Sequence, residues 1–221
     1  MAAGRTTRAK TTATPDGRAP RRQGRATRDR LLAAAVPALS ESGYHATRVD
    51  DVVRLAGVSH GTFYLYFANM EDLFRALAER CADDAAALAA SLGEVPDDAT
   101  GQAALRAWLA DFIDFYRRYG VVIRAWAENQ VTDRGLAKLG VVSFDRIATT
   151  LRSSIAAADG GSSAARTKAR ARQVELRADA LLALLERFSY VVTSRDLGWD
   201  DERLLDGLSL LVHRGFFRAA G

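Results

Sequence analysis

The hydrogen-bonding side chains of greatest interest in this 221-residue chain lie in one short run, SHGTFYLY at residues 59–66. Ser59 and Thr62 can each donate or accept a hydrogen bond, His60 can do either through its ring, and Gly61 permits close backbone approach. Base edges in the DNA major groove present a complementary pattern of donors and acceptors. These residue types at this spacing therefore favour the recognition of base edges.

The other reactive side chains do not form a pattern that is typical of a catalytic site. Three histidines are scattered along the chain, at His45, His60 and His213, and the single cysteine is Cys81. The sequence has no phosphate-binding glycine loop and no His, Cys and carboxylate cluster with metal-ligand spacing. We therefore expect no enzyme, no metal and no cofactor. A lone cysteine excludes an internal disulfide and fits a reducing cytoplasm.

Two short helices are predicted to position the polar run. A capping-box pattern that starts at Thr47 opens a helix over 48–56, and Gly57 stands where that helix would end. Ser59 can cap the second helix, over 59–66. Two short helices joined by a glycine-containing turn are a candidate helix-turn-helix, a unit that places its second helix in the DNA major groove.

Helical periodicity continues along the chain, so we predict an all-α fold. The first helix starts near Thr27 and stops at Gly43, with Pro37 expected to kink or weaken it. Residues 1–24 lack periodicity, which predicts a disordered arm. The later predicted helices cover 70–92, 101–118, 120–130, 134–158, 168–194 and 201–218. We therefore divide the chain into the arm at 1–24, a helix-turn-helix domain at 25–74 and a larger helical domain at 75–221.

Positive charge is concentrated at the N-terminus. Residues 1–30 hold nine Lys or Arg against Asp16 and Asp29, a net charge of +7, whereas the rest of the chain carries −3. Such an arm is typical of a segment that binds a polyanion through its positive charge. The alternative is a tail that only increases solubility. The longest apolar run, residues 31–39, is too short to cross a bilayer, and no signal-peptide pattern precedes it, so no membrane partner is expected.

Residues 43–74, GYHATRVDDVVRLAGVSHGTFYLYFANMEDLF, resemble the DNA-binding domain of the tetracycline-repressor (TetR) family. The string Gly-Val-Ser-x-Gly-Thr-x-Tyr-x-x-Phe at 57–67 is the most specific part of this resemblance, which covers roughly residues 27–75. The family implies a three-helix head and a C-terminal helical bundle that binds a ligand and dimerises. It also implies a homodimeric, ligand-responsive transcriptional regulator, usually a repressor of a palindromic DNA operator.

The resemblance assigns DNA contacts by position. They are Thr47 and Arg48 at the start of the second helix, and Ser59, His60, Gly61, Thr62, Tyr64 and Tyr66 on the recognition helix. His60 and Thr62 are expected to read bases, and Leu65 could touch a thymine methyl. Thr47 and Tyr66 are expected to contact phosphates.

Two positions depart from the family pattern. Met70 stands where a Lys commonly precedes Glu-Asp-Leu, and Asp50 stands where many members have a basic or neutral residue. Residues 25–75 carry six basic and six acidic residues, so this domain is itself neutral. We therefore expect DNA affinity to depend on the arm, in which the missing phosphate contact would come from Arg21, Arg22, Arg25 or Arg28.

Aromatic side chains in the C-terminal domain are typical of a ligand cavity. Their helical spacing places several on one stripe, with Arg124, Glu128 or Asn129 as candidates to orient a ligand, although the rings could simply fill the core. The expected ligand is a small, mainly apolar effector of unknown identity. The candidate ligand-binding residues are Trp108, Phe112, Phe115, Tyr116, Trp126, Asn129, Phe144 and Phe188.

The last two predicted helices are apolar on more than one side, which indicates a second partner for each. In the family, two such helices from each subunit form a four-helix dimer interface. A helix buried within a monomer is the competing account. The candidate interface residues are Leu182, Leu185, Leu204, Leu208, Leu211 and Val212.

The functional hypothesis is a homodimer whose two heads bind successive major grooves of a palindrome. An effector in the bundle would favour a conformation with a different head spacing, and the resemblance implies helix 70–92 as the coupling element. Two alternatives stay open. One is an activator of the same fold, and the other is an architectural protein that binds DNA mainly through its arm.

Overall fold

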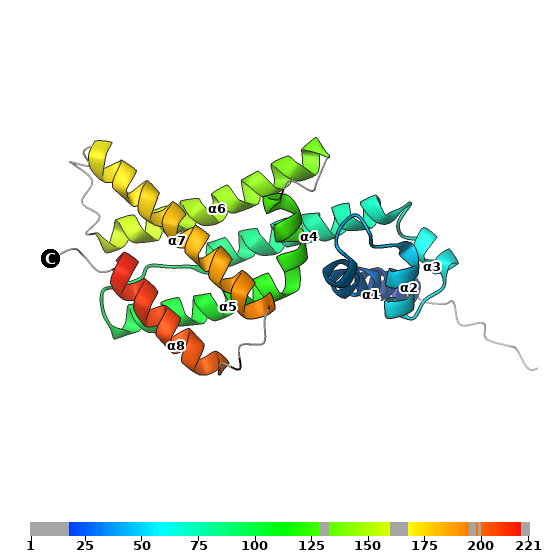
Figure 1. The fold of residues 1–221 in the computed structure, drawn as a ribbon, viewed down its shortest axis with the longest axis horizontal. Helices are drawn as coiled ribbons and strands as arrows, with labels where there is room; N and C mark the ends of the chain where they lie inside the picture. Colours follow the sequence, from blue (N-terminus) through cyan, green and yellow to red (C-terminus); the bar gives the residue numbers. More distant parts are fainter. Residues whose placement is uncertain (1–17, 129–132, 160–167, 195–197, 199, 218–221) are drawn as a thin grey trace, which may run out of the picture.

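The computed structural model describes residues 18–128, 133–159, 168–194, 198 and 200–217, and over these residues it contains helices and no strand (Figure 1). The predicted all-α fold class is thereby confirmed. The helices are, in chain order, α1 (Arg18–Ser42), α2 (Val49–Ala56), α3 (His60–Tyr64), α4 (Met70–Ser91), α5 (Ala99–Ala127), α6 (Arg134–Ala158), α7 (Lys168–Ser194) and α8 (Asp201–Val212). A π-helical turn, η1 (His213–Phe217), continues α8.

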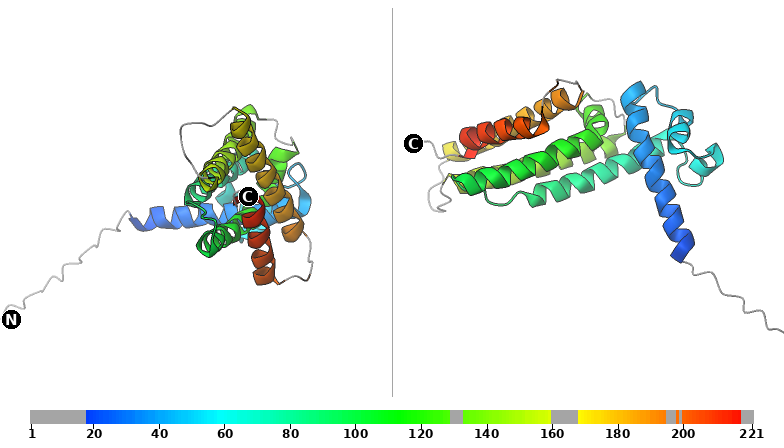
Figure 2. Two further views of the ribbon diagram at one scale, coloured as in Figure 1. Left: turned by 90° about the vertical axis from the view of Figure 1, so that its left-hand side faces the viewer. Right: turned by 90° about the horizontal axis from the view of Figure 1, so that it is seen from below.

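The helices pack into a small head and an elongated bundle (Figures 1 and 2). The head consists of α1, α2, α3 and the start of α4, and its core includes Leu31, Leu39, Val52, Phe63 and Phe67. The remainder of α4 runs along α6 and α5 in the bundle. Because one continuous helix belongs to both groups, a rotation of α4 would move the head.

The first helix is longer than the sequence predicts. It begins at Arg18, inside the segment expected to be a disordered arm, and it continues through Pro37 without a break. Adding residues to a formed helix is much easier than starting a new one, which accounts for the extension over 18–24. Burial of the neighbouring Ala38 and Leu39 offsets the hydrogen bond that Pro37 cannot donate. Residues 1–17 of the predicted arm lie outside the described residues.

The helices predicted over 101–118 and 120–130 are a single helix, α5, which passes through Gly120. Figure 1 shows that the C-terminal part of α5 turns away from the direction of its first part. A Cβ at Gly120 would lie 3.2 Å from the Tyr116 ring, which is tighter than an ordinary contact. Glycine at this position therefore leaves room for the ring. Burial of Tyr119 and Val122 holds the helix together on both sides of the glycine.

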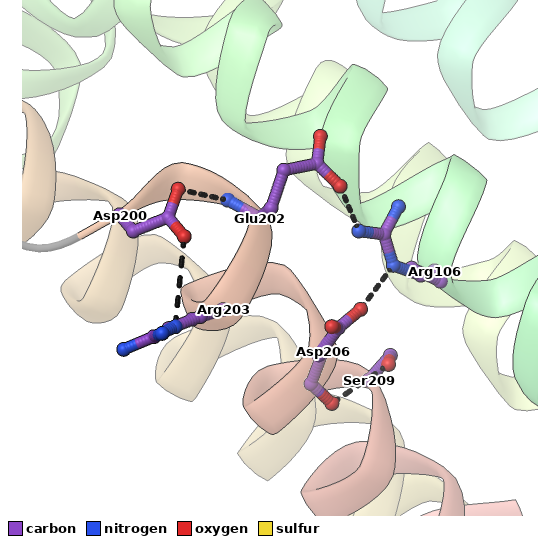
Figure 3. Close-up of polar contacts among 6 residues, drawn as sticks. All are labelled: Arg106, Asp200, Glu202, Arg203, Asp206 and Ser209. Carbon is purple, nitrogen blue, oxygen red and sulfur yellow. Dashed lines mark hydrogen bonds and ion pairs between the residues drawn. The ribbon is translucent and has the colours of Figure 1, made fainter.

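Ion pairs fasten α8 to α5 (Figure 3). Arg106 on α5 contacts both Glu202 and Asp206 on α8, with its Nε 2.6 Å from an Asp206 carboxylate oxygen. Asp200 caps the start of α8 by accepting a hydrogen bond from the Glu202 N–H. These ion pairs involve the acidic residues of α8, and its apolar residues are not part of them.

Among the described residues, no helix combines the length and the apolar character that a bilayer crossing requires.

Candidate DNA-binding surface and effector cavity

The helix-turn-helix is built by local capping. Gly57 ends α2 in the left-handed conformation, at φ 62°, where its N–H donates to the Arg54 carbonyl. The Ser59 hydroxyl then caps α3 by accepting from the Thr62 N–H at 3.1 Å. Phe63 is fully buried, and it fixes α3 against the head. The five residues of α3 therefore lie across the end of the molecule (Figure 1).

The structure brings most of the predicted DNA-binding residues together on the outer side of α3. Ser59, His60, Gly61 and Tyr64 are exposed, while Thr62 and Tyr66 are partly buried. Leu65 is 80% exposed and adds an aliphatic side chain to this surface. This surface presents hydroxyls, an imidazole and an aliphatic group. Hydroxyls and an imidazole can hydrogen-bond to base edges and phosphates, and an aliphatic group can contact a thymine methyl.

Thr47 lies differently from its predicted place. It is buried, and its hydroxyl donates to the Gly43 carbonyl at 2.6 Å, so it faces α1 instead of solvent. The cap of α2 falls one residue later than predicted, because the Arg48 N–H donates to the Asp51 carboxylate at 3.1 Å. Arg48 is exposed and is the member of the pair that can reach a phosphate.

One contact on this surface was not predicted from the sequence. His60 Nε2 lies within hydrogen-bond distance of the Asp50 carboxylate, and both side chains are more than half exposed. The pair joins α2 to α3 and orients the imidazole. The two residues are ten positions apart on different helices, so no local pattern could have revealed it.

The basic half of α1 lies beside the segment that follows α3. A Cβ at Gly24 would be 3.6 Å from the Tyr66 hydroxyl, and the Arg28 guanidinium lies over the Phe67 ring, 5.4 Å from its centre. Arg25, which lies between Gly24 and Arg28 in the sequence, is exposed. The side chains of Arg21 and Arg22 lie outside the described part of the chain. Positive charge from α1 thus adjoins the predicted DNA-binding surface.

A small, partly open cavity lies among α4, α5, α6 and α7. Its volume of about 20 Å³ is room for roughly one water molecule. Cys81 from α4 and Ile147 from α6 belong to the lining. Of the predicted ligand-binding residues, those that line it are Phe112, Phe115, Tyr116, Trp126 and Phe144.

Three predicted ligand-binding residues are not part of this cavity. The Trp108 indole is buried, and its N–H donates to the Leu88 carbonyl at 2.9 Å, which makes it part of the core. Phe188 lines a groove between α7 and α8. Asn129 lies outside the described residues.

The cavity contains few polar groups. The Tyr116 hydroxyl donates to the Glu186 carboxylate at 3.1 Å, and burial together with this carboxylate raises the pKa of Tyr116 well above its usual range. The buried indole N–H of Trp126 has no acceptor among the described residues. Burial also raises the pKa of the Cys81 thiol, which keeps it neutral and unreactive. Sequence reasoning missed Glu186, which lies on α7, far along the chain from the aromatic stripe.

The predicted dimer residues divide into two groups. Leu204, Leu208 and Leu211 line an open groove of about 620 Å³ between α7 and α8. Leu185 and Val212 are buried in the core of the bundle, and Leu182 lines the cavity. The apolar surface that α7 and α8 leave uncovered is therefore centred on α8.

An ion pair connects the head to the bundle at the start of α4. Arg75 Nη2 lies 2.8 Å from an Asp133 carboxylate oxygen, and Asp133 also caps α6 by accepting from the Leu136 N–H at 2.8 Å. Nearby, Tyr44 packs edge-on against Phe74, with ring centres 4.5 Å apart. Because α6 lines the cavity, this pair links the cavity wall to the head.

Comparison with known proteins gives a consistent result for the head. Residues 31–77 match the model of the family described as bacterial regulatory proteins, tetR family. The chain is 45% identical over 47 residues to the fatty acid metabolism regulator protein of Bacillus subtilis, an overlap that covers 21% of this chain and 24% of that protein. The alignment thus spans about a quarter of this curated relative.

Solved structures extend the similarity over the whole fold. The transcriptional regulator PfmR from Thermus thermophilus is 20% identical, with a TM-score of 0.61, over 86% of this chain and 100% of that chain. FadR from Bacillus subtilis, solved in complex with stearoyl-CoA, is 18% identical, with a TM-score of 0.59, over 87% of this chain and 99% of that chain. At these identities the likeness establishes the fold. The matched proteins are regulators, which agrees with the expectation that the chain is not an enzyme.

Proposed function

We propose that this chain is a repressor that binds a palindromic operator as a homodimer, which the match of residues 31–77 to the tetR family of bacterial regulatory proteins supports. A small effector bound in the bundle releases it from DNA. The observation that carries the proposal is the outer side of α3, where Ser59, His60 and Tyr64 are exposed while Phe63 is buried beneath them. A short helix held this way can enter a major groove with its polar side chains toward the bases.

A dimer is supported by the groove between α7 and α8. Leu211 is 57% exposed, and Leu204, Leu208 and Phe188 lie beside it in the groove. A single soluble chain gains stability by covering such a surface, and a two-fold axis allows each copy to cover the other. Two heads then face a palindrome whose half-sites are about 34–36 Å apart or a multiple of that spacing.

An effector role is supported by the position of the cavity. Phe144 and Ile147 of α6 line it, and the N-cap of the same helix, Asp133, is paired with Arg75 of α4. The cavity has room for only about one water molecule in this conformation, so a larger ligand requires α6 or α7 to move. A ligand that binds only the expanded form shifts the population toward it, and α4 carries the change to the head.

The first test is selection of random duplex DNA by the purified full-length protein at near-physiological salt, followed by sequencing. We expect enrichment of a palindrome. Binding that is not enriched for any sequence and vanishes at higher salt would identify an architectural protein instead. Placing the selected operator before a reporter then separates a repressor from an activator by the sign of the response.

The basic segment is proposed to supply phosphate contacts. Gly24 lies against the Tyr66 hydroxyl and Arg28 over the Phe67 ring, and the exposed Arg25 stands between them in the sequence of α1. Deleting residues 1–24 should weaken operator binding and reduce its dependence on salt, and Arg25→Ala should lower the salt slope by about 1. Exposed Arg146 on α6, away from both the head and the groove between α7 and α8, provides the matched control, as Arg146→Ala. Unchanged affinity and salt slope in the deletion would refute a role for the arm.

A further inference from the structure

We propose that the cavity takes an organic cation, an amine or quaternary ammonium with a compact apolar body, whose charge is held by Glu186 and the surrounding aromatic rings. The inference rests on the proposed function in one respect, because it names the chemical class of the effector.

The first argument is the chemistry of the cavity wall. Five aromatic side chains line it, and the remainder of the lining is mainly aliphatic. The face of an aromatic ring is negative, so a cation inside a group of rings is attracted, and the attraction strengthens where water is excluded. The five are Phe112, Phe115, Tyr116, Trp126 and Phe144.

The second argument is the carboxylate in this wall. Glu186 is half-buried, and the contact it makes is with the neutral Tyr116 hydroxyl. The guanidinium of Arg124 acts electrostatically on Tyr116 but lies over the Tyr190 ring, 5.6 Å from its centre. Within the described chain Glu186 forms no ion pair. A half-buried carboxylate without a cationic partner is less well solvated than one in open water, and a cationic ligand would supply the missing partner.

The third argument is the charge outside the cavity. A groove of about 390 Å³ between α6 and α7 shares Phe144, Leu182 and Glu186 with the cavity, so these side chains separate the two spaces. Asp145 and Asp179 also line the groove, with Arg152 between them at 3.6 and 2.9 Å. Three carboxylates against one guanidinium make the approach acidic, which attracts cations and repels carboxylates.

The same arrangement disfavours an acidic effector. A free fatty acid that entered past Asp145 and Asp179 would bring its carboxylate next to Glu186. Like charges at short range in a poorly hydrated space repel strongly. The unpartnered indole N–H of Trp126 further favours a cation whose body carries a hydrogen-bond acceptor.

The test is calorimetric titration of the full-length protein with three ligands of similar size and different charge: 2-phenylethylammonium, phenylacetamide and phenylacetate. We expect the cation to bind more tightly than the other two. Glu186→Gln should weaken cation binding roughly tenfold or more, with little effect on phenylacetamide. Glu175→Gln, an exposed change on the same helix, should leave all three affinities unchanged.

A second variant keeps the test decisive if Glu186→Gln unfolds. Phe144→Leu removes one ring while keeping an apolar side chain, and it should weaken the cation more than phenylacetamide. Absence of cation binding at millimolar concentration, tighter binding of phenylacetate, or equal cation binding by wild type and Glu186→Gln would each overturn the proposal.

Measuring whether each ligand releases the protein from its operator distinguishes failure of this inference from failure of the proposed function. Cation binding that depends on Glu186 but leaves the operator complex intact would support the cavity chemistry and refute the effector role. Release by a neutral or acidic ligand would have the opposite meaning. It would support a ligand-responsive repressor and overturn the cationic class.

Discussion

His60 and its partner define what the head can read at the scale of single residues. Its Nε2 lies against the Asp50 carboxylate, so a neutral ring that donates this proton presents Nδ1 to DNA as an acceptor. An acceptor suits the amino groups of adenine or cytosine. Asp50 also places a negative charge beside the surface that must approach phosphates. On the proposed function, we therefore expect Asp50, which departs from the family pattern, to restrict both the DNA sequence that is bound and the affinity of binding.

His60→Ala should cost about 1–3 kcal/mol of affinity for the selected operator, because a base contact is lost. Binding to random DNA should change little. Fluorescence anisotropy with both duplexes measures the difference. His45→Ala, which removes another exposed histidine of the head, is the matched control. Equal losses on operator and random DNA would show that His60 reads no base.

Ser189 is a buried residue of α7 whose hydroxyl has no partner among the described residues. Ser189→Ala should raise the free energy of unfolding by about 1 kcal/mol, because an unsatisfied hydroxyl is removed from the core. The buried Ser143 hydroxyl instead donates to the Leu139 carbonyl at 2.8 Å, so Ser143→Ala should give no such gain. Urea unfolding of both variants compares them, and equal changes would contradict this account.

At the scale of elements, the ends of helices carry the connections between parts. Asp133 caps α6 and pairs with Arg75, and the Leu136 N–H and then Arg75 hold the pKa of its carboxyl below the ordinary value. Asp200 caps α8, whose other acidic residues reach across to α5 (Figure 3). Each of these caps positions a helix that borders a proposed binding surface.

The carboxylate of Asp133 should stabilise the fold only where it is charged. Because its folded pKa is depressed, its contribution is present above its ordinary pKa of about 4 and is lost as the pH falls through the folded value. Asp133→Asn keeps a capping oxygen and removes the charge. It should therefore be less stable than wild type at pH 6, with the difference shrinking toward pH 3. Urea unfolding at both pH values measures this, and a difference independent of pH would contradict it.

Arg106→Leu should loosen α8 from α5, because the guanidinium joins two carboxylates of α8. We expect a loss of stability at low salt and a smaller loss at high salt, since salt screens partly exposed pairs. Arg54→Leu removes a pair at 3.7 Å from a side chain that is 65% exposed, away from α8, and should have little effect. Thermal unfolding at two salt concentrations distinguishes the variants.

At the scale of the whole molecule, α4 joins the head to the bundle, and the groove on α7 and α8 sets where a second copy would lie. The two heads of a dimer are then held at a separation that depends on the angle of α4 in each subunit. The cavity wall and the Arg75–Asp133 pair both act on that angle. On the proposed function, we therefore expect dimerisation, effector binding and DNA affinity to depend on this one arrangement of helices.

Leu211→Glu should convert a dimer to a monomer without unfolding it, because Leu211 is 57% exposed in the single chain and lies in the groove. Operator affinity should fall with it, since each head would bind alone. Leu176→Glu changes a leucine that is 71% exposed on α7 outside the groove and should leave the dimer intact. Sedimentation velocity at micromolar concentration decides, and a monomeric wild type would refute the interface.

Features that depend on neighbouring residues could be predicted from the chain alone. Glycine at 57, a capping serine at 59 and buried aromatics at 63 and 67 specify the turn and the short helix within one segment. The aromatic stripe on α5 predicted Phe112, Phe115 and Tyr116 in the cavity wall, because helical spacing alone places them on one side.

Which distant residues meet depends instead on how the helices pack. The Asp50–His60 pair, the Glu186 carboxylate opposite Tyr116, and the Arg75–Asp133 link each join different helices, and no periodicity encodes them. Trp108 and Phe188 were predicted to line the cavity, but Trp108 packs in the core and Phe188 lines the groove between α7 and α8. A helix in the bundle packs against more than one neighbouring helix, and residue spacing does not say which neighbour a ring faces. Local sequence fixes which side of a helix is apolar, and packing between helices then selects what that side encloses.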